Sequence, residues 1–215
     1  YLHSMAVCAG NVGGLTWPDR VLPIVPMFHA NAWGLPYAAL LAGSSLLMPD
    51  RWLQAEPITR FMVASRPTVS GAVPTVWNDV LGHLDQLVSA GTPADLSSLR
   101  LVLCGGSAVP VSLQTALSER HGIEMRQAWG MTETSPVASV AAAPAGVDGD
   151  RIWRYRGGQG RPLPGVEARI IGPDGTALPH DRESVGELEV RGPWVTGGYY
   201  RSEERRVGKE CRSRW

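Results

Sequence analysis

The stretch that decides the fold covers residues 124–135 and has the sequence EMRQAWGMTETS. Its first four residues predict a short β-strand, and the remainder is a polar loop. In this loop Trp129 supplies a ring that can stack on a base, and Gly130 lets the backbone approach a phosphate closely. Thr132 supplies a hydroxyl for a phosphate oxygen, and Glu133 supplies a carboxylate for Mg²⁺. The stretch therefore predicts a strand followed by a nucleotide-binding loop; the alternative is an ordinary polar loop after a strand.

Upstream of this stretch, short strand-like segments alternate with longer helical ones. Two of the helical segments have a proline at their start, where a missing N–H costs little. Strands that alternate with helices predict an α/β fold, in which a parallel sheet carries helices on both faces. The predicted strands are 21–25, 45–48, 68–71, 101–104 and 124–127, and the predicted helices are 32–42, 58–64, 74–87 and 111–120.

The loops after these strands are where a ligand is expected. In a parallel sheet with helices on both faces, ligands bind beyond the carboxyl ends of the strands. Residues 105–107, Gly-Gly-Ser, follow one predicted strand, and residues 128–135 follow the next. Both segments are therefore predicted to lie on the same rim of the sheet.

Downstream, the pattern changes. Residues 136–158 are rich in alanine, glycine and proline, which predicts a surface excursion. Residues 166–171 and 186–191 alternate as strands do, and residues 172–175, Gly-Pro-Asp-Gly, predict a turn. We therefore divide the chain into an α/β core, residues 1–158, a small β subdomain, residues 159–200, and a C-terminal tail, residues 201–215.

This tail differs in composition from the rest of the chain. It contains the only lysine, Lys209, whereas arginine alone carries the basic charge before Arg201. The segment RSEER at residues 201–205 resembles the translation of a short-read sequencing adapter, so we expect residues 201–215 to be non-native. A charged, solvated C-terminal segment is the alternative.

Charge and cysteine usage restrict the class of protein. The chain has 20 basic and 20 acidic residues; without the tail, 14 basic and 17 acidic residues remain, a net charge of about −3. Neither balance indicates a protein that binds nucleic acid or a membrane surface. No apolar run has the length of a membrane span, and no signal peptide is recognisable. Cys8 and Cys104 lie in apolar surroundings without metal-ligand spacing, so we expect a reducing, cytoplasmic compartment.

Four further segments accompany the 124–135 stretch in a fixed order. They are 26–33 (PMFHANAW), 70–77 (SGAVPTVW), 105–110 (GGSAVP) and 192–200 (GPWVTGGYY). Together the five motifs resemble, over essentially all of residues 1–200, the bacterial fatty-acyl-CoA synthetases (long-chain fatty acid–CoA ligases) of the adenylate-forming, AMP-binding superfamily. The resemblance implies the large N-terminal domain of these enzymes and a two-step reaction. The carboxylate of a fatty acid attacks the α-phosphate of ATP to give acyl-AMP and pyrophosphate, and the thiol of coenzyme A then displaces AMP to give acyl-CoA.

The resemblance also implies a nucleotide site. Glu133 matches the family's Mg²⁺ ligand, and Thr132 matches its phosphate contact. Trp129 matches the aromatic residue that stacks on adenine, which is often tyrosine in the family. The other implied AMP-site positions are Gly106, Gln127 and Ala128. Here the implied co-substrates and cofactor are ATP, coenzyme A and Mg²⁺.

An acyl site is implied in the same way. His29 matches a ring beside the acyl carboxylate, and with Thr132 and Glu133 it completes the implied catalytic set. Trp33 matches a tryptophan that gates the fatty-acyl tunnel, which favours a medium- to long-chain acid as the substrate. The implied wall of the acyl pocket consists of small or apolar residues, for which ordinary packing is the alternative: Ala30, Gly71, Ala72 and Val73.

Parts of the family's active site have no match in this sequence. A lysine-bearing phosphate loop would precede Tyr1, and a ribose-binding aspartate and a C-terminal domain would follow Tyr200. We therefore expect a central fragment that does not catalyse adenylation by itself. Related synthetases can dimerise, so a homodimer is compatible with the resemblance.

Other readings remain open. Another acid–CoA ligase or an amino-acid adenylation domain would use the same scaffold, although residues 28–33 lack the aspartate that usually holds an amino-acid substrate. A non-catalytic nucleotide-binding remnant is the alternative outside the enzymes. A serine hydrolase is disfavoured because residues 105–109, GGSAV, lack the closing glycine of its nucleophile motif.

Overall fold

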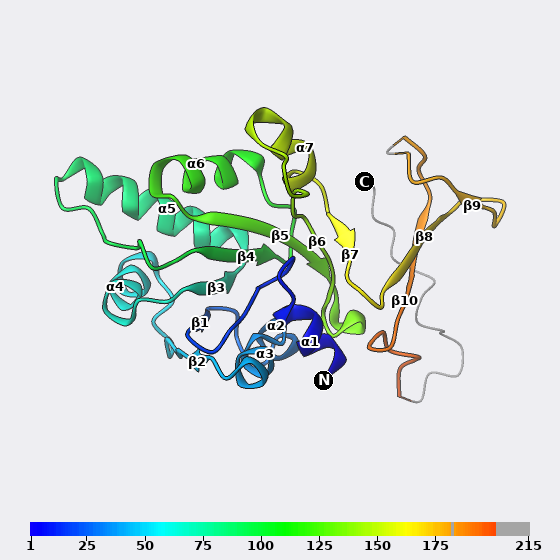
Figure 1. Ribbon diagram of the computed structural model, residues 1–215, viewed down its shortest axis with the longest axis horizontal. Helices are drawn as coiled ribbons and strands as arrows, with labels where there is room; N and C mark the ends of the chain where they lie inside the picture. Colours follow the sequence, from blue (N-terminus) through cyan, green and yellow to red (C-terminus); the bar gives the residue numbers. More distant parts are fainter. Residues whose placement is uncertain (182, 201–215) are drawn as a thin grey trace.

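The computed structural model describes residues 1–181 and 183–200, which form a seven-stranded sheet with helices packed on it and a separate three-stranded sheet (Figure 1). The expected non-native tail, residues 201–215, lies outside the described residues. The strand order of the larger sheet is β2-β1-β3-β4-β5-β6-β7. Some strands that are neighbours in the sheet, such as β1 and β3, do not follow each other in the sequence. The chain therefore crosses over the sheet between them, as alternating strands and helices predict.

Five of the seven strands are parallel, as predicted, and the last two are antiparallel. The parallel strands at residues 20–23, 69–72 and 101–105 are buried almost throughout, as expected for strands of a parallel sheet covered on both faces. The strands are β1 Arg20–Pro23, β2 Ser45–Leu46, β3 Val69–Ala72, β4 Leu101–Gly105, β5 Glu124–Gly130, β6 Val137–Val140 and β7 Arg161–Pro162.

Helices cover both faces of this sheet, which confirms the predicted fold class. Side chains of β4 alternate between the faces: Leu101 and Leu103 join one apolar cluster, and Val102 and Cys104 join the other. The first cluster lies under α1 Leu2–Cys8 and α3 Leu35–Ala42. The second lies under the remaining long helices, α4 Ala55–Ser65, α5 Pro74–Ser89 and α6 Val111–His121.

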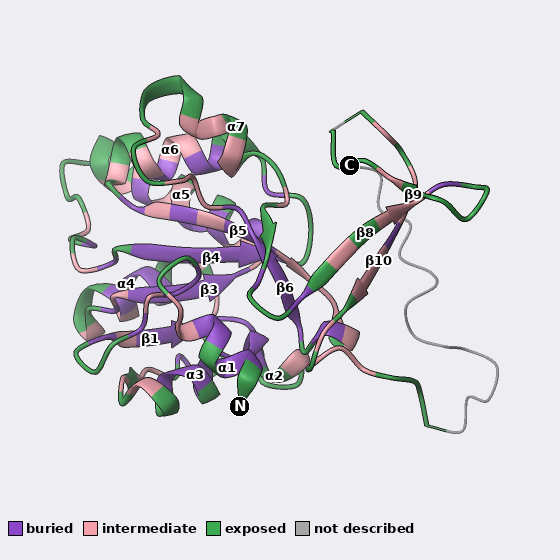
Figure 2. Cartoon of the chain, turned by 45° about the vertical axis from the view of Figure 1, so that its right-hand side comes forward, coloured by how far each residue is buried: buried purple, intermediate pink, exposed green. Residues whose placement is uncertain are grey.

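The prediction of a surface excursion over residues 136–158 was wrong in its first part. Residues 137–140 form β6, whose four residues are buried and pair antiparallel with β5 (Figure 2). Only the segment after β6 lies at the surface, where it forms the 3₁₀ turn Gly149–Ile152 and α7 Trp153–Arg156. A strand buried on both faces shows no alternation of polar and apolar residues, so its pattern gave no signal.

The predicted helix over residues 32–42 is divided in two. α2 Ala30–Trp33 is a single turn, and α3 begins after Gly34. Backbone φ angles are positive throughout α2, so this turn winds in the opposite sense to α3. Periodicity in the sequence cannot reveal this change of handedness, because the same side chains are apolar in either case.

The smaller sheet is antiparallel, in the order β10-β8-β9. Its strands are β8 Glu167–Ile171, β9 Ala177–Leu178 and β10 Glu187–Arg191. Residues 166–171 and 186–191 were predicted as strands, and β9 was not. The larger sheet continues through β7 to Pro162, and the proposed division of the chain at residue 158 stays a prediction.

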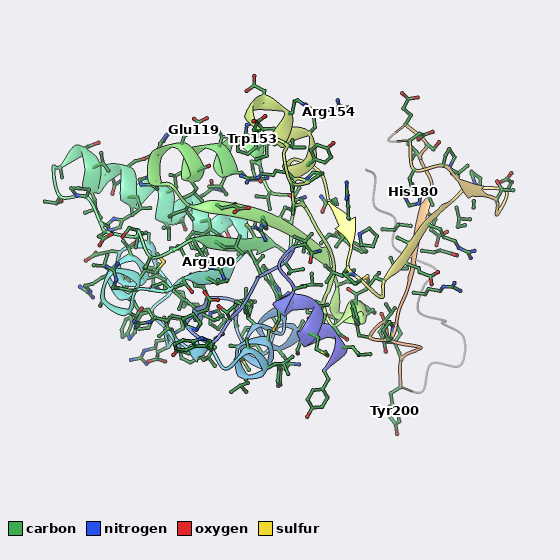
Figure 3. The ribbon with its side chains drawn as sticks, in the orientation of Figure 1. Arg100, Glu119, Trp153, Arg154, His180 and Tyr200 are labelled. Atoms are coloured by element: carbon green, nitrogen blue, oxygen red, sulfur yellow. The ribbon has the colours of Figure 1, made fainter. Side chains whose placement is uncertain are left out.

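A polar network lies at the amino-terminal edge of the larger sheet. Asp19 is 5% exposed, and Arg100 binds it with Nη2 3.0 Å from Oδ2. The same guanidinium also donates to the carbonyl oxygens of Gly13 and Gly14, and Thr68 donates to Asp19 Oδ1 at 2.6 Å. Arg100 (Figure 3) therefore joins the loop after α1 to the start of β1 and β3, on the opposite edge from the predicted ligand site.

Candidate nucleotide and acyl site

The loops after β1, β4 and β5 enclose one cavity of about 280 Å³ at the carboxyl ends of the parallel strands. Eight of the twelve residues predicted from the sequence line it: His29, Ala30, Trp33, Gly106, Ala128, Trp129, Thr132 and Glu133. Gly130, which the sequence indicated as a point of close backbone approach, lines it too, as do four residues that sequence reasoning did not single out: Gly105, Met131, Pro136 and Val137. Residues from three strand ends thus meet in one place, as the parallel topology requires.

The Thr132–Thr134 segment is a 3₁₀ turn that a buried hydroxyl holds in shape. Thr134 is 1% exposed, and its Oγ1 accepts a hydrogen bond of 2.9 Å from the Met131 N–H. The Thr134 hydroxyl can donate to the carbonyl oxygen of Met131 or of Pro136. Because these bonds tie both ends of the turn to one side chain, Thr132 and Glu133 are held against the cavity. Sequence reasoning assigned Thr134 no role.

Glu133 is held from a second direction by the segment after β10. The Thr196 N–H donates to the Glu133 carbonyl oxygen at 2.8 Å, and the Tyr199 hydroxyl donates to the Glu133 carboxylate. Ser135 donates to the carbonyl oxygen of Trp194 at 2.9 Å. The motif at residues 192–200 therefore lies against the loop at residues 131–135, although the two are about sixty residues apart in the sequence.

The donor set at Glu133 is compatible with magnesium. Among residues 1–181 and 183–200, no group of three or more His, Cys, Asp or Glu side chains is placed to hold a metal ion. Mg²⁺ is commonly bound by only one or two carboxylates together with substrate phosphates and water. Glu133, half-buried and facing the cavity beside the Thr132 hydroxyl, fits that requirement as a single carboxylate ligand.

Trp129 lies between this cavity and a larger one. The second cavity, of about 710 Å³, separates the β6–β7 edge and α7 from the smaller sheet, and Trp129 borders both. Trp153 and Arg154 line it from α7, and His180 lines it from the loop after β9 (Figure 3). Trp129 therefore forms part of the wall of both cavities.

Two of the predicted AMP-site residues, Gly106 and Ala128, lie at the wall of the cavity, whereas the Gln127 side chain does not. Gly106 has φ +84°, a conformation that favours glycine, and a Cβ there would lie 3.3 Å from Val73 Cγ1. Gly106 and Ala128 line the cavity. The side chain of Gln127 points elsewhere: Oε1 accepts from the Val109 N–H at 2.7 Å, and Nε2 donates to the Gly158 carbonyl at 3.0 Å. Gln127 is 2% exposed and does not line the cavity, so its amide fixes the loops around the site.

The α2 turn is left-handed over four consecutive residues that are not glycine. Their φ angles are +45°, +53°, +50° and +57° for Ala30, Asn31, Ala32 and Trp33. Each L-residue in this conformation costs about 1–2 kcal/mol, so the turn carries about 4–8 kcal/mol of strain. Burial of one tryptophan side chain removes about 200 Å² from water, which is worth about 5 kcal/mol. Trp33 is only 6% exposed. The free energy gained by burying its side chain is therefore similar in size to the strain energy of the turn.

Trp33 fills the space in which an acyl chain was predicted. An added Cβ at Gly71 would lie 3.9 Å from Trp33 Cε3 and 2.6 Å from Leu35 Cδ1, and one at Gly106 would lie 3.8 Å from Trp33 Cζ2. The indole therefore occupies the gap between the ends of β3 and β4. Gly71, Ala72 and Val73 do not line the 280 Å³ cavity; Val73 packs against the core cluster that contains Trp33, and Ala72 belongs to the opposite core cluster.

Two histidines take different positions around the site. His29 is exposed, lies directly before the left-handed turn and lines the cavity. His3, in α1, was not singled out by the sequence. It is 7% exposed, and its Nε2 accepts a hydrogen bond of 3.2 Å from the Val137 N–H. Its ring also meets Trp194 edge to face at 5.9 Å. Burial, with a smaller effect of the Tyr1 ammonium, lowers the pKa of His3 from 6.5 to about 4.

Solved structures share this fold. The crystal structure of a long-chain fatty-acid–CoA ligase from Archaeoglobus fulgidus superposes with a TM-score of 0.80 at 24% identity, covering 96% of this chain and 40% of that one. Its sheet and this one therefore have the same arrangement.

No helix within the described part of the chain combines the length and apolar character needed to cross a bilayer.

Comparison of the amino-acid sequence with known families and relatives assigns the chain to a protein family. The family model for AMP-binding enzymes matches residues 1–200, and the chain belongs to that family. It is similar to the long-chain-fatty-acid–CoA ligase of Thermus thermophilus, with 40% identity over 206 residues. It is also similar to the medium-chain-fatty-acid–CoA ligase of Ectopseudomonas oleovorans, with 36% identity over 205 residues. Each alignment covers 94% of this chain and 37% of the relative, so the chain spans little more than a third of their length.

Proposed function

We propose that the chain forms the nucleotide- and acyl-binding part of an ATP-dependent fatty acid–CoA ligase. The observation that carries this proposal is the single cavity at the strand ends, which brings the 124–135 loop and the 26–33 loop together. An adenylation site must hold a nucleotide phosphate and a carboxylate in contact, and these two loops supply groups for each.

The roles follow from the chemistry of each side chain. The Trp129 ring stacks on adenine, with Gly106 allowing the base and ribose to approach the backbone closely. The Thr132 hydroxyl donates to a phosphate oxygen, and Glu133 would hold Mg²⁺, which offsets the charge of the phosphates as the carboxylate approaches. His29 faces the cavity from the opposite loop, where its ring can orient the acyl carboxylate.

The acyl group is proposed to be a medium- or long-chain fatty acid. Both relatives described above are named for such acids, and the residues beside Trp33 are glycine, alanine and valine. No charged side chain is present among residues 70–74 to bind a polar acid. ATP and coenzyme A are the co-substrates of the proposed reaction.

The test is the binding of AMP with Mg²⁺, and of dodecanoyl-sulfamoyladenosine, to the purified chain by isothermal titration calorimetry. Replacing Trp129 with alanine should weaken the binding of both by about 10-fold or more, since stacking of a base on an aromatic side chain contributes about 1–3 kcal/mol. Trp52→Ala is the matched control, because Trp52 is 55% exposed and lies outside the cavity. Failure of the wild-type chain to bind either ligand, or equal effects of the two substitutions, would contradict the proposal.

A further inference from the structure

We propose that Tyr199 is a positioning residue for a Mg²⁺ ion held by Glu133. The Tyr199 hydroxyl donates a hydrogen bond to Oε1 of the Glu133 carboxylate, and this bond leaves Oε2 available as the metal ligand. The inference rests on the proposed function, which supplies the Mg²⁺ site at Glu133. It gives a role to the motif at residues 192–200, to which the proposed function assigns none.

The backbone of Glu133 is already held in place on two sides. Glu133 lies in the 3₁₀ turn Thr132–Thr134, and the hydroxyl of Thr134 accepts a hydrogen bond of 2.9 Å from the Met131 N–H. The Thr196 N–H donates to the Glu133 carbonyl oxygen at 2.8 Å. The side-chain torsions are therefore the main remaining freedom of the carboxylate. A contact that restricts these torsions favours ion binding, because less conformational entropy is then lost when the ion binds.

The Glu133 carboxylate has a neutral hydrogen-bond donor but no protein cation beside it. Within residues 1–181 and 183–200, no arginine or histidine side chain forms an ion pair with Glu133. The hydrogen bond from Tyr199 restricts the orientation of the carboxylate without neutralising its charge. This combination suits a metal ligand, because carboxylates that bind metals are themselves commonly hydrogen-bonded to a further residue of the protein.

The segment that carries Tyr199 is anchored to the rest of the molecule. The Ser135 hydroxyl donates to the Trp194 carbonyl oxygen at 2.9 Å, and the Thr196 N–H is bonded as described above. A Cβ at Gly165 would lie only 3.3 Å from Trp194 Cζ3, so the indole packs closely against that glycine. Tyr199 follows Thr196 by three residues, so its hydroxyl approaches the carboxylate from a segment that is fixed at two points.

The position of Tyr199 favours a positioning role over a blocking one. Glu133 lines the 280 Å³ cavity, in which the ion and the phosphates are proposed to bind, and Tyr199 does not. The hydroxyl therefore meets the carboxylate from outside that cavity and contacts one of its two oxygens. A blocking hydroxyl would have to leave before Mg²⁺ binds, so its removal would strengthen binding. Removal of a positioning hydroxyl weakens binding, and the sign of the effect distinguishes the two roles.

The test measures how strongly Mg²⁺ enhances the binding of ATP to the purified chain. Isothermal titration calorimetry gives the affinity for ATP with Mg²⁺ and with EDTA, and the ratio of the two is the enhancement. In Tyr199→Phe the enhancement should fall by about 10-fold, the smaller end of the range for partners of metal ligands, because Tyr199 is 51% exposed. The affinity for metal-free ATP and the Tm should stay unchanged. Tyr37→Phe is the matched control, because Tyr37 is 49% exposed and does not line the cavity.

A second variant isolates the carboxylate. Glu133→Gln gives the enhancement that does not depend on Glu133, and adding Tyr199→Phe to it should change nothing further, because no carboxylate remains to be positioned. Tyr199→Leu also lacks the hydroxyl and serves if the phenylalanine variant does not fold.

The outcomes separate this inference from the proposed function. An unchanged or larger enhancement in Tyr199→Phe would overturn the inference alone, and so would equal losses of affinity with and without Mg²⁺, which indicate a purely structural role. A wild-type enhancement equal to that of Glu133→Gln would show that no ion binds at Glu133, and the inference would fail together with the proposed metal site. A wild-type chain that binds no ATP would contradict the proposed function itself, and the inference with it.

Discussion

His3 should make the stability of the chain depend on pH between about 4 and 6.5. Its ring is buried between α1, β6 and Trp194, and burial lowers its pKa from 6.5 to about 4. Between these values the unfolded chain binds a proton at this residue and the folded chain does not. Stability from His3 is therefore complete above pH 6.5 and is lost as the pH falls toward 4. At pH 5 the loss is about 2 kcal/mol relative to neutral pH.

The assay is urea unfolding of the wild-type chain and of His3→Gln at pH 5.0 and pH 7.5. Gln does not titrate, and its Oε1 can accept the hydrogen bond from the Val137 N–H that His3 Nε2 accepts at 3.2 Å. The wild-type midpoint should fall by about 1 M more than that of the variant between the two pH values, taking a slope of about 2 kcal/mol per M. Equal falls in both proteins would refute the reasoning, because other titrating groups contribute equally to each.

Three further results are expected. Arg100→Met should lower the free energy of unfolding by about 2–3 kcal/mol, since it leaves the buried Asp19 carboxylate without its cation, and Asp19→Asn should restore part of this loss in urea unfolding. Burial raises the pKa of Cys104 to about 12, so iodoacetamide at pH 8 should label this thiol only after unfolding, as peptide mass spectrometry would show. Thr134→Val should weaken AMP binding while Thr134→Ser retains it, since the hydroxyl shapes the turn; equal losses in titration calorimetry would contradict that role.

The parallel part of the sheet could be predicted because its strands are apolar segments separated by helices of ordinary length. β4 and β5 begin at the predicted residues and extend one and three residues further. β6 could not be predicted in the same way. Four consecutive buried residues, Val137–Val140, look like any short apolar run within an alanine-rich segment, and only pairing with β5 makes them a strand.

The site was predictable as a set of loops but not as a set of side-chain directions. Thr132, Glu133 and Gly106 follow strands that are neighbours in the sheet, so topology alone brings them together. The direction of Gln127 depends on where Val109 and Gly158 lie, which local sequence does not specify. The part played by His3 depends on contacts with residues more than 130 positions away and had no local signal.

The contacts between the loop at residues 131–135 and the segment after β10 have a consequence for protein engineering. The Thr196 N–H donates to the backbone carbonyl of Glu133, and the Ser135 hydroxyl donates to the backbone carbonyl of Trp194, so the backbones of the two segments must fit each other in shape. A chimaera that takes residues 131–137 from one family member and residues 192–197 from another would join two loops with independently chosen lengths and turns. Exchanging both segments together keeps the matched pair intact, and recombination libraries built on this scaffold should treat them as a single inherited block.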